Sequence, residues 1–433
     1  MKFVADLHIH SKFSRATARD MTLDTLAYWA KIKGISLLAT GDFTHPEWFF
    51  LCKQKLEPAG NGFYKLKKPI PPENEYLDSI TFSQNEVFFI LSAEISFIYS
   101  KQGKVRKIHI LVLAPDFEAV EKINSRLSGI GNLRSDGRPI LGLDAKEFVK
   151  IVADFSPECT VIPAHIWTPW FSLFGANSGF DKIEECFEEM TPFIFALETG
   201  LSSDPPMNWR LSCLDKYSLI SNSDAHSPSK IGREANVFNC DFSYTGLIDA
   251  IKSKDPDNFL YTVEFFPEEG KYHYDGHRKC KVIFSPQDTL QHKGLCPECH
   301  KKLTVGVLHR VNELADREPG AVSHFKIPFK NLIPLNEIIA QAVDKSATCK
   351  SVWDLYFNFI REFGSEHSIL TEVHLTDLER ISPEKISKGI ERMRKGQVNI
   401  IPGHDGEFGV IDLFDKNFPS GTQDPDEPQL NLF

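Results

Sequence analysis

The stretch Asp6-Leu7-His8-Ile9-His10 stands near the start of the chain, directly after a short apolar run. This pattern predicts a β-strand, in which alternate side chains point to the same face. We therefore expect Asp6, His8 and His10 to point together, with Leu7 and Ile9 packed in the core. Imidazole and carboxylate groups in such an array suit zinc, manganese or iron. The stretch thus predicts a metal site on a strand.

The same kind of pattern continues along the first 265 residues, where short apolar runs alternate with amphipathic stretches. Alternating strand and helix signals predict an α/β domain with mainly parallel strands. Residues able to bind a metal fall at or just after the ends of the apolar runs. Because a β/α barrel builds its site at that edge, this arrangement favours a barrel with a metal-dependent site.

Six later segments each place a ligand-type residue beside a predicted strand end: Gly41–His45, Ser92–Glu94, Lys107–His109, Pro163–His165, Leu197–Gly200 and Ser223–His226. A single residue of this kind is more often an ordinary polar side chain. Together the segments supply too many ligands for one ion and about the number needed for two or three. Clustered divalent ions bind a phosphate, activate water and stabilise the leaving oxygen. The sequence therefore predicts hydrolysis of a phosphate ester.

The order of these residues resembles the PHP (polymerase and histidinol phosphatase) superfamily. The resemblance implies a distorted seven-stranded β/α barrel with a cluster of two or three divalent ions, which could be Zn, Mn, Fe or Mg. It implies His8, His10, Glu94 and Asp224 as ligands of one ion, Glu94, His109 and His165 as ligands of a second, and Asp42 with His226 at a third. The catalytic residues would be Asp224, His226 and Glu94.

Three positions match the superfamily less clearly. His45 and Glu198 are kept as residues near the site. Arg15 stands where some members of the superfamily have a further histidine, so the third ion stays an open question.

A second metal-binding pattern is Cys296-Pro297-Glu298-Cys299. Two cysteines separated by two residues form the tight turn in which two thiolates meet one tetrahedral zinc ion. Cys280 and His277 would complete the site, although His273 or His300 could instead supply the fourth ligand. A redox dithiol would be expected beside a thioredoxin-like βαβ unit, whereas this motif follows a lysine-rich loop. We therefore expect one structural zinc ion.

The sequence around this motif carries a narrower resemblance, to the endonuclease Q family. It rests on Lys271–Cys280, Leu303–Arg310, Asn331–Leu335 and Pro402–Glu407 and extends over nearly the whole chain. The resemblance implies a repair endonuclease that cuts the DNA phosphodiester on the 5′ side of uracil, hypoxanthine, xanthine or an abasic site. A damaged or mismatched base is also the easiest base to extrude from a duplex.

Changes in composition divide the chain into four expected parts. They are a metal-dependent catalytic barrel (1–265), a zinc-binding module (266–321), a mixed segment that binds DNA and the lesion (322–416) and a flexible tail (417–433). Apolar periodicity predicts helices near Leu335–Val343, Val352–Phe363 and Pro383–Lys395.

Binding to DNA has to overcome a net charge of -10. Residues 271–310 oppose it, with eight Lys/Arg against three Asp/Glu, and bound cations would add positive charge. Candidate phosphate contacts are Lys271, Arg278, Lys279, Lys281, Lys301 and Lys302. The run Trp167–Phe171 could stack on DNA or pack in the barrel, and Tyr272, Tyr274 and Phe363–His367 are candidates for a base pocket.

The chain ends in Gln429-Leu430-Asn431-Leu432-Phe433. This peptide resembles the pentapeptide by which bacterial repair and replication proteins bind the sliding clamp. The resemblance implies a clamp contact through Gln429, Leu430, Leu432 and Phe433.

Two further features bear on the setting of the protein. No apolar run reaches the roughly 18 residues of a membrane-spanning helix, and the first residues show no secretory signal. The nine cysteines are scattered except near residues 280–299, which argues against a disulfide scaffold. We expect a cytoplasmic monomer with no membrane contact.

Two other classes of function remain as alternatives. A PHP-type phosphoesterase acting on a small phosphorylated metabolite or nucleotide would need neither the zinc motif nor the tail peptide. A binding protein that has lost catalysis would be expected to lack ligands, yet the full set from Asp6 to His226 is present. The endonuclease is therefore the preferred interpretation.

Overall fold

The computed structural model describes residues 1–70, 86–324, 326–381 and 383–414. The tail peptide Gln429–Phe433 lies outside these residues. In the described part of the chain, no helix combines the length and the apolar character that a membrane span requires.

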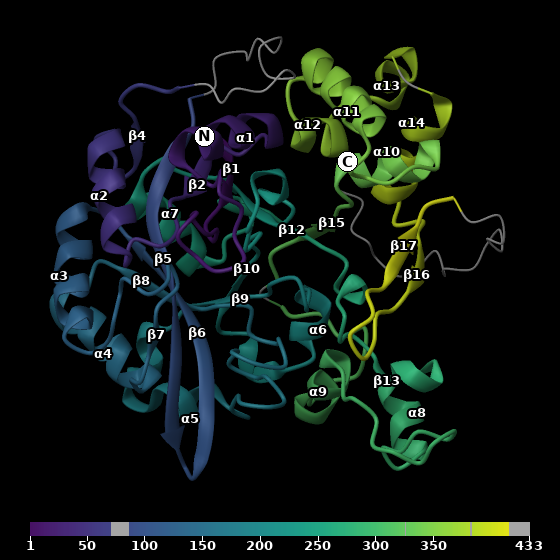
Figure 1. Ribbon diagram of the computed structural model, residues 1–433, viewed down its shortest axis with the longest axis horizontal. Helices are drawn as coiled ribbons and strands as arrows, with labels where there is room; N and C mark the ends of the chain where they lie inside the picture. Colours follow the sequence, from purple (N-terminus) through teal and green to yellow (C-terminus); the bar gives the residue numbers. More distant parts are fainter. Residues whose placement is uncertain (71–85, 325, 382, 415–433) are drawn as a thin grey trace.

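A mixed sheet dominates the N-terminal part of the protein, drawn in purple to teal, and one later strand, drawn in green, joins its edge (Figure 1). Its strands in the described residues are β1 (Lys2–Asp6), β2 (Leu37–Ala39), β3 (Leu56–Pro58), β4 (Tyr64–Leu66), β5 (Phe88–Lys101), β6 (Lys104–Ala114), β7 (Ile140–Leu141), β8 (Thr160–Pro163), β11 (Ala235–Asn239), β12 (Phe259–Glu264) and β15 (Phe329–Asn331). They follow the order β15-β12-β11-β1-β2-β5-β4-β3, with β6 between β5 and β8 and with β7 beside β5.

The expectation of mainly parallel strands is wrong. β1 pairs with β2, and β2 with β5, in parallel, but β5–β6, β6–β8, β1–β11 and β11–β12 are antiparallel. The physical reason for the largest exception is a tight turn at Gln102-Gly103, where both residues have positive φ. Such a turn matches the twist of a two-stranded hairpin, so β5 and β6 run side by side without a crossover helix.

A parallel pair of short strands lies beside this sheet. It consists of β9 (Ala196–Glu198) and β10 (Ser218–Ile220). The backbone N–H of Ile166, just after β8, donates to the carbonyl of Glu198. An isolated parallel bridge joins Ile9 to Ala225. The chain segments that follow β8, β9, β10 and β1 are therefore close neighbours.

Helices cover the sheet and form most of the C-terminal part. Those of the N-terminal part are α1 (Leu23–Lys33), α2 (Pro46–Lys55), α3 (Phe117–Ser128), α4 (Ala145–Phe155), α5 (Ile183–Phe187), α6 (Pro205–Trp209) and α7 (Tyr244–Ser253). The later ones are α8 (Pro286–Gln291), α9 (Val307–Leu314), α10 (Leu335–Val343), α11 (Lys350–Phe363), α12 (Glu366–Thr371), α13 (Leu375–Ile381) and α14 (Glu384–Arg394). The expected helices near Leu335–Val343, Val352–Phe363 and Pro383–Lys395 correspond to α10, α11 and α14.

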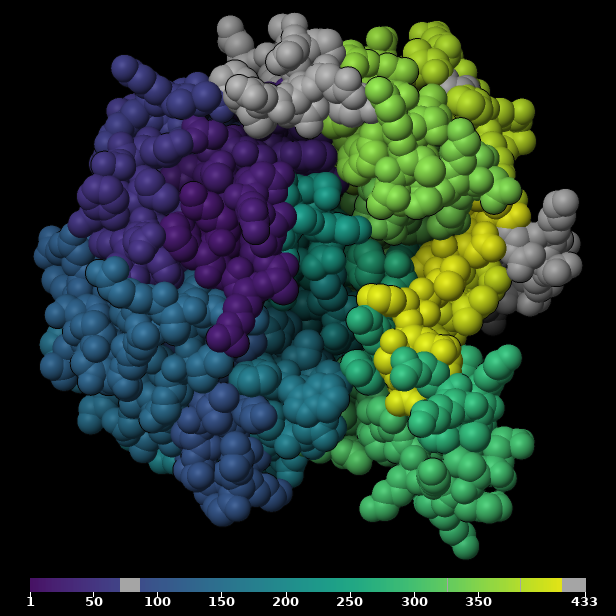
Figure 2. Space-filling model, viewed as in Figure 1, coloured from purple at the N-terminus to yellow at the C-terminus, as the bar shows by residue number. Residues whose placement is uncertain are grey.

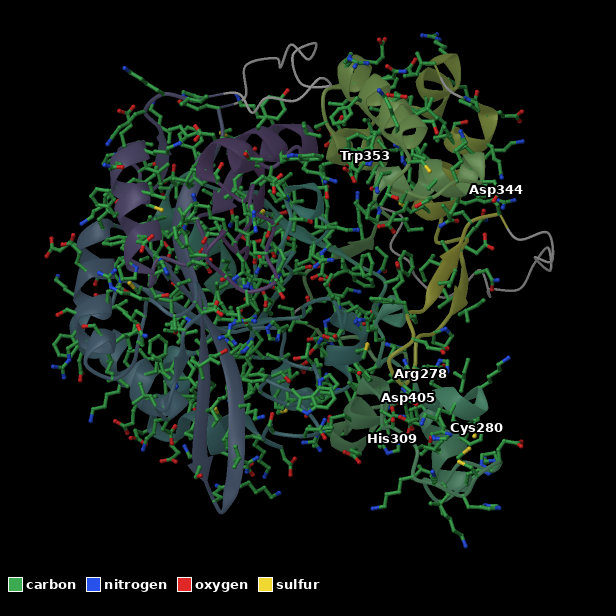
Figure 3. All side chains as sticks on the ribbon, viewed as in Figure 1. Arg278, Cys280, His309, Asp344, Trp353 and Asp405 are labelled. Atoms are coloured by element: carbon green, nitrogen blue, oxygen red, sulfur yellow. The ribbon has the colours of Figure 1, made fainter. Side chains whose placement is uncertain are left out.

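Two small antiparallel pairs complete the fold, β13 (Asp275–His277) with β14 (Val282–Phe284) and β16 (Asn399–Ile401) with β17 (Val410–Asp412). The loop between β16 and β17 packs on the segment that carries the cysteines. There the carboxylate of Asp405 accepts the backbone N–H of Arg278 at 2.7 Å and the hydroxyl of Thr304 at 2.6 Å. Figure 3 shows Arg278, Cys280, His309 and Asp405 gathered at this contact, with Trp353 and Asp344 in the helical part.

A buried ion pair joins the N-terminal part to the C-terminal helices. Lys33, at the end of α1, pairs with Glu366, at the start of α12, and both side chains are more than nine-tenths buried. The same carboxylate accepts the hydroxyl of Tyr356 at 2.5 Å and the backbone N–H of Leu335 at 3.1 Å. Because every oxygen of Glu366 is paired, the two parts are fixed in one arrangement at this point.

Candidate metal-dependent active site

Six predicted ligands meet in the N-terminal part, four of them just after strand ends and two, Glu94 and His109, in the middle of long strands. His8 and His10 follow β1, Glu94 lies on β5, His109 on β6, His165 follows β8 and Asp224 follows β10. β1 ends at Asp6, so the motif is not one continuous strand. The carboxylate of Asp6 turns away and accepts the backbone N–H groups of Ser223 and Gly232. Asp6 therefore holds the Asp224 loop in place and does not point with the two histidines.

The first group comprises His8, His10, Glu94 and Asp224, with one ligand atom from each within 4.8 Å of the others. His10 Nε2 lies 3.0 Å from Asp224 Oδ1 and 3.2 Å from Glu94 Oε2. His8 Nε2 lies 3.6 Å from the same Glu94 oxygen. Among the described residues, the two Nε2 atoms and Asp224 Oδ1 are buried without a hydrogen-bond partner. Converging, unpaired nitrogen and oxygen atoms fit a divalent cation.

The second group comprises Glu94, His109 and His165. Glu94 Oε1 lies 2.6 Å from His109 Nδ1 and 2.9 Å from His165 Nε2. Glu94 thus directs one oxygen to each group, as a carboxylate that bridges two ions would. This geometry could hold two neighbouring cations.

The other nitrogen of each histidine faces an orienting partner. His8 Nδ1 lies 2.9 Å from Glu198, and His10 Nδ1 lies 3.1 Å from Asp42. His109 Nε2 and His165 Nδ1 lie 2.6 and 3.2 Å from the hydroxyls of Ser96 and Thr168, respectively. Metal-binding histidines are commonly held in this way, because the outer contact fixes both the tautomer and the ring orientation.

Three residues at the same place have a strained backbone. Asp42, His165 and Asp224 have positive φ values of 49°, 30° and 46°. Non-glycine residues rarely adopt this left-handed region, and clusters of such residues are typical of functional sites. Gly200 also approaches closely, since a Cβ on it would lie 2.4 Å from His165 Cβ. The fold therefore maintains an unfavourable local geometry in order to assemble these side chains.

The two central carboxyl groups carry negative charge. Burial by itself raises the pKa of Glu94, but His109 and Arg138 hold it well below its usual range. The pKa of Asp224 is also lowered, because contacts with His10 and His8 outweigh burial. A buried carboxylate, Glu94, and a partly buried one, Asp224, that stay ionised at neutral pH are suitable ligands for cations.

Three further candidates lie around the groups but do not join them. Both oxygens of Asp42 are engaged, Oδ1 with His10 and Oδ2 with Ser11 and Ser14. The His226 ring lies 4.5 Å from that of His10, and its Nδ1 is 2.9 Å from the carbonyl of Asp224. His45 stacks on Phe13 instead. In this arrangement Asp42 orients His10, while His226 borders the site on its more exposed side.

One residue at the site carries no signal in the sequence. Arg138 precedes β7, and its Nη1 donates to Glu94 Oε2 at 2.9 Å. It stands in an Asp-Gly-Arg-Pro loop that contains no recognised motif. Only the folded chain brings this loop to β5.

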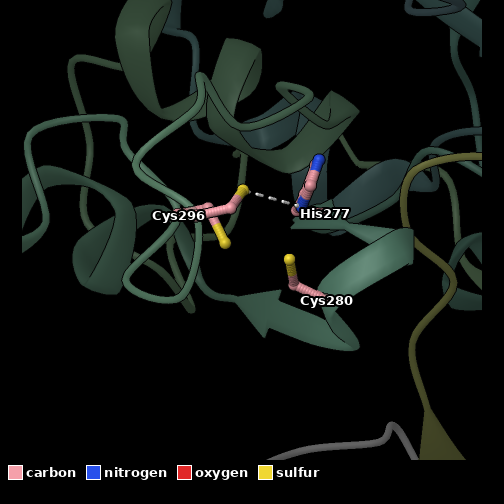
Figure 4. A group of neighbouring side chains, drawn as sticks. His277, Cys280 and Cys296 are labelled. Atoms are coloured by element: carbon pink, nitrogen blue, oxygen red, sulfur yellow. Dashed lines mark hydrogen bonds between the residues drawn. The ribbon is translucent and has the colours of Figure 1, made fainter.

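A third cluster brings together His277, Cys280, Cys296 and Cys299, and one ligand atom of each lies within 4.8 Å of the others. His277 is thus the histidine that joins the three thiols, and Figure 4 shows it facing Cys280 and Cys296. Cys299 Sγ lies 3.6 Å from His277 Nδ1. Burial raises the pKa of the Cys296 thiol, but the backbone N–H groups of Cys299 and Glu298 lower it below its usual value. A thiolate held by such N–H groups fits a tetrahedral zinc site.

Glu264 is a further buried carboxyl group in the N-terminal part, at the end of β12. The Thr199 hydroxyl donates to its Oε2 at 3.0 Å, while Oε1 has no hydrogen-bond partner in the part of the chain that the structure describes. Burial raises the pKa of Glu264 to about 8. The group is therefore mostly neutral in the folded protein at pH 7.

This shift predicts a pH-dependent stability. Between the ordinary pKa of 4.5 and about 8, the folded state binds a proton on Glu264 that the unfolded chain has lost. Stability therefore falls as the pH rises through this window. We expect Glu264→Gln to have little effect at pH 5 and to raise the thermal midpoint at pH 8 by roughly 4 °C or more in calorimetry. The exposed Glu379→Gln serves as control, and an equal loss of stability at both pH values would contradict the assignment.

The two ligand groups of histidines and carboxylates have Glu94 in common and lie on a mixed α/β fold. This arrangement is that of a metal-dependent phosphoesterase. The protein is therefore a hydrolase. A family model described as the MJ0043 C-terminal domain matches residues 334–397. The protein MJ0043 of Methanocaldococcus jannaschii is 34% identical over 255 residues, which are 57% of this chain and 31% of that protein. This chain thus spans about a third of the length of that relative.

Two solved structures match along nearly the whole chain. The lesion-specific endonuclease PfuEndoQ from Pyrococcus furiosus is 30% identical, with a TM-score of 0.82 and 95% of each chain covered. Endonuclease Q in complex with a 27-mer duplex substrate with an abasic lesion at the active site is 29% identical. That match has a TM-score of 0.81 and covers 98% of this chain and 100% of the other. This chain belongs to the endonuclease Q family.

Proposed function

We propose that this protein is a metal-dependent endonuclease that hydrolyses the DNA phosphodiester on the 5′ side of a deaminated base (uracil, hypoxanthine or xanthine) or an abasic site. The observation that carries the proposal is the pair of buried ligand groups joined by Glu94, in a chain that aligns end to end with lesion-specific endonucleases. An enzyme that cuts a phosphodiester needs such paired positive charge at the reacting phosphate.

The residues of the site divide the work. His8, His10, Glu94 and Asp224 would hold one ion, and Glu94, His109 and His165 a second. Bound divalent ions supply an activated water molecule and stabilise charge on the phosphate oxygens. Glu198 and Asp42 fix the orientation of two ligating rings. His226, about a third exposed, can pass a proton between the site and solvent, and with Asp42 it would border a third ion.

The expected barrel also belongs to this proposal. Seven strands, β1, β2, β5, β6, β8, β9 and β10, would surround the site. Hydrogen bonding from β1 through β8 supports it, as do the link from Ile166 to Glu198 and the bridge from Ile9 to Ala225. Residues 1–265 would form this catalytic part, 266–321 a zinc module and 322–416 the part that contacts the lesion.

DNA would lie in the hollow between the N-terminal and C-terminal parts. The space-filling view is hollowed there, between purple-to-blue residues on one side and green and yellow residues on the other (Figure 2). Aromatic side chains lie next to the ligand residues and continue toward the zinc segment. The ring centroids of Phe171 and His109 are 4.7 Å apart. Trp170, the exposed neighbour of Phe171 in the sequence, has its ring centroid 5.8 Å from that of Tyr272 in the zinc segment. Such rings stack on unpaired bases, and exposed Lys271 and Arg278 would contact phosphates.

The test is a cleavage assay with end-labelled duplexes that carry one uracil, one hypoxanthine or one abasic site, in Mg²⁺ or Mn²⁺. We expect a single cut on the 5′ side of each lesion and none in the undamaged duplex. Turnover of small phosphorylated metabolites without cleavage of any duplex would instead support the alternative of a small-molecule phosphoesterase.

The cysteine cluster gives a separate prediction. Cys296→Ser should release about one equivalent of zinc and loosen the segment around β13 and β14, because structural zinc contributes folding energy directly. Lesion binding should fall more than hydrolysis of bis-p-nitrophenyl phosphate. Cys213→Ser, an exposed cysteine outside the cluster, is the control. Unchanged zinc content, measured by mass spectrometry, would exclude Cys296 as a ligand.

The tail peptide Gln429–Phe433 remains a predicted contact with a sliding clamp. Three buried apolar side chains of about 1.5–3 kcal/mol each, less the cost of ordering, correspond to micromolar affinity. Deleting the peptide should leave cleavage of a short duplex unchanged and abolish clamp binding in calorimetry. The absence of heat at high micromolar peptide would contradict the prediction, as would equal clamp binding by the deletion variant. A cytoplasmic location and a monomeric state stay predictions from the sequence.

A further inference from the structure

The loop that carries Arg138 is held from both sides. Asp136 Oδ1 accepts the backbone N–H groups of Arg15 at 3.3 Å and of Arg138 at 3.1 Å. The Gly137 N–H donates to the carbonyl of Phe13, and the Gly137 carbonyl accepts the Thr44 hydroxyl at 3.2 Å. The loop is therefore fixed against the segments that follow β1 and β2.

This loop lies in close contact with the residues that orient the ligands. A Cβ on Gly137 would lie 2.3 Å from Asp42 Oδ2 and 2.4 Å from Ser14 Oγ. No larger residue fits at position 137 without displacing Asp42. The close approach places the next side chain, that of Arg138, over the site.

The guanidinium of Arg138 is only partly used by the protein. Nη1 donates to Glu94 Oε2, and within the described residues Nε and Nη2 have no hydrogen-bond acceptor. The side chain is 27% exposed. Two sets of donors thus remain open toward solvent beside the ligand groups.

Pairing with Glu94 uses only one nitrogen of this cation. Glu94 already contacts His109 at 2.6 Å, His165 at 2.9 Å and His10 at 3.2 Å. A guanidinium placed beside groups that would hold divalent ions adds repulsion between like charges. The arrangement becomes favourable once an anion occupies the space between them. A planar guanidinium matches the oxygens of a phosphate group.

We propose that Arg138 is a catalytic residue that donates hydrogen bonds to a non-bridging oxygen of the scissile phosphodiester. The inference rests on the proposed phosphodiesterase activity and adds a protein cation to the ions that stabilise the transition state. Fixed donors of this kind gain strength where charge develops, because they need no reorganisation during the reaction.

The test compares Arg138→Gln and Arg138→Lys with Arg134→Gln, which removes an exposed arginine of the same loop. We expect Arg138→Gln to lower kcat about 10²–10³-fold on bis-p-nitrophenyl phosphate and on a lesion duplex. Arg138→Lys should recover part of the loss, and Arg134→Gln should match the wild type. Metal content and lesion-duplex affinity at equilibrium are measured for every variant.

A phosphorothioate at the scissile linkage distinguishes direct contact from support of Glu94. Sulfur is a poor hydrogen-bond acceptor, so on one diastereomer the wild type has already lost the contact, and the penalty of Arg138→Gln should shrink to about tenfold or less. Equal penalties on the oxygen substrate and both diastereomers, no penalty at all, or a loss of metal from Arg138→Gln would each overturn the proposal. If the wild type fails on lesion duplexes but hydrolyses bis-p-nitrophenyl phosphate, the lesion function falls. The kinetics of the variants on that diester, together with their metal content, then still decide the role of Arg138.

Discussion

Replacing Asp224 with asparagine should lower phosphodiester cleavage by about 10³-fold or more while the fold is retained. The change removes one negative charge from the oxygen that lies 3.0 Å from His10 Nε2 and 3.7 Å from His8 Nε2. Asparagine has nearly the same shape, so packing is preserved. The loss therefore reports on the held cation and on the chemistry that it supplies.

The experiment measures kcat, metal content and circular dichroism on the same preparations. Asp257→Asn, at an exposed aspartate outside the ligand groups, controls for loss of charge alone. Lesion-duplex affinity of Asp224→Asn should stay close to that of the wild type. If the variant keeps near-normal cleavage at saturating metal, Asp224 does not belong to the catalytic site.

A second large effect is expected at the buried pair of Lys33 and Glu366. Lys33→Met removes one member and leaves the Glu366 charge buried among Tyr356 and Leu335, and Glu366→Gln does the reverse. Removing one partner of a buried pair costs about 3–5 kcal/mol, because the remaining charge is uncompensated. We expect either variant to lower the thermal midpoint strongly.

The double variant Lys33→Met/Glu366→Gln should be less destabilised than the sum of the single variants, which isolates the coupling. Glu384→Gln breaks an exposed pair with Lys388 on α14 and should leave the thermal midpoint nearly unchanged, because solvent screens such a pair. Additive losses in the double variant would mean that the two side chains do not interact energetically.

Much of the site could be predicted from the sequence because most of its residues follow strand ends, although Glu94 and His109 lie in the middle of β5 and β6. His8, His10, Glu94 and Asp224 are brought together as the PHP resemblance implies. Helices with a continuous apolar stripe, such as α11, were also predicted close to their observed ends.

The direction of the strands was harder to predict. Apolar runs around β5 and β6 look alike whether a helix or a two-residue turn connects them. The glycine in Gln102-Gly103 was the available signal, since glycine readily adopts the positive φ that a two-residue hairpin turn requires. The roles of Asp42 and Arg138 depend on which atoms face which neighbours, and spacing along the chain carries no such information. Tertiary packing alone directs Asp42 to His10 and Arg138 to Glu94.

The pairing of β1 with β11 has a consequence for the folding of the chain during its synthesis on the ribosome. His8 and His10 are made first, but Asp224 emerges more than 200 residues later, roughly 10–45 s at ordinary rates of synthesis. During that interval the edge of β1 has no partner from β11, and the two histidines remain separated from their carboxylate. Glu366, which anchors α1 through Lys33, appears later still. The nascent chain must therefore stay protected from aggregation until β11 is made, and a cation could be held by all four residues of the first group only after Asp224 has emerged.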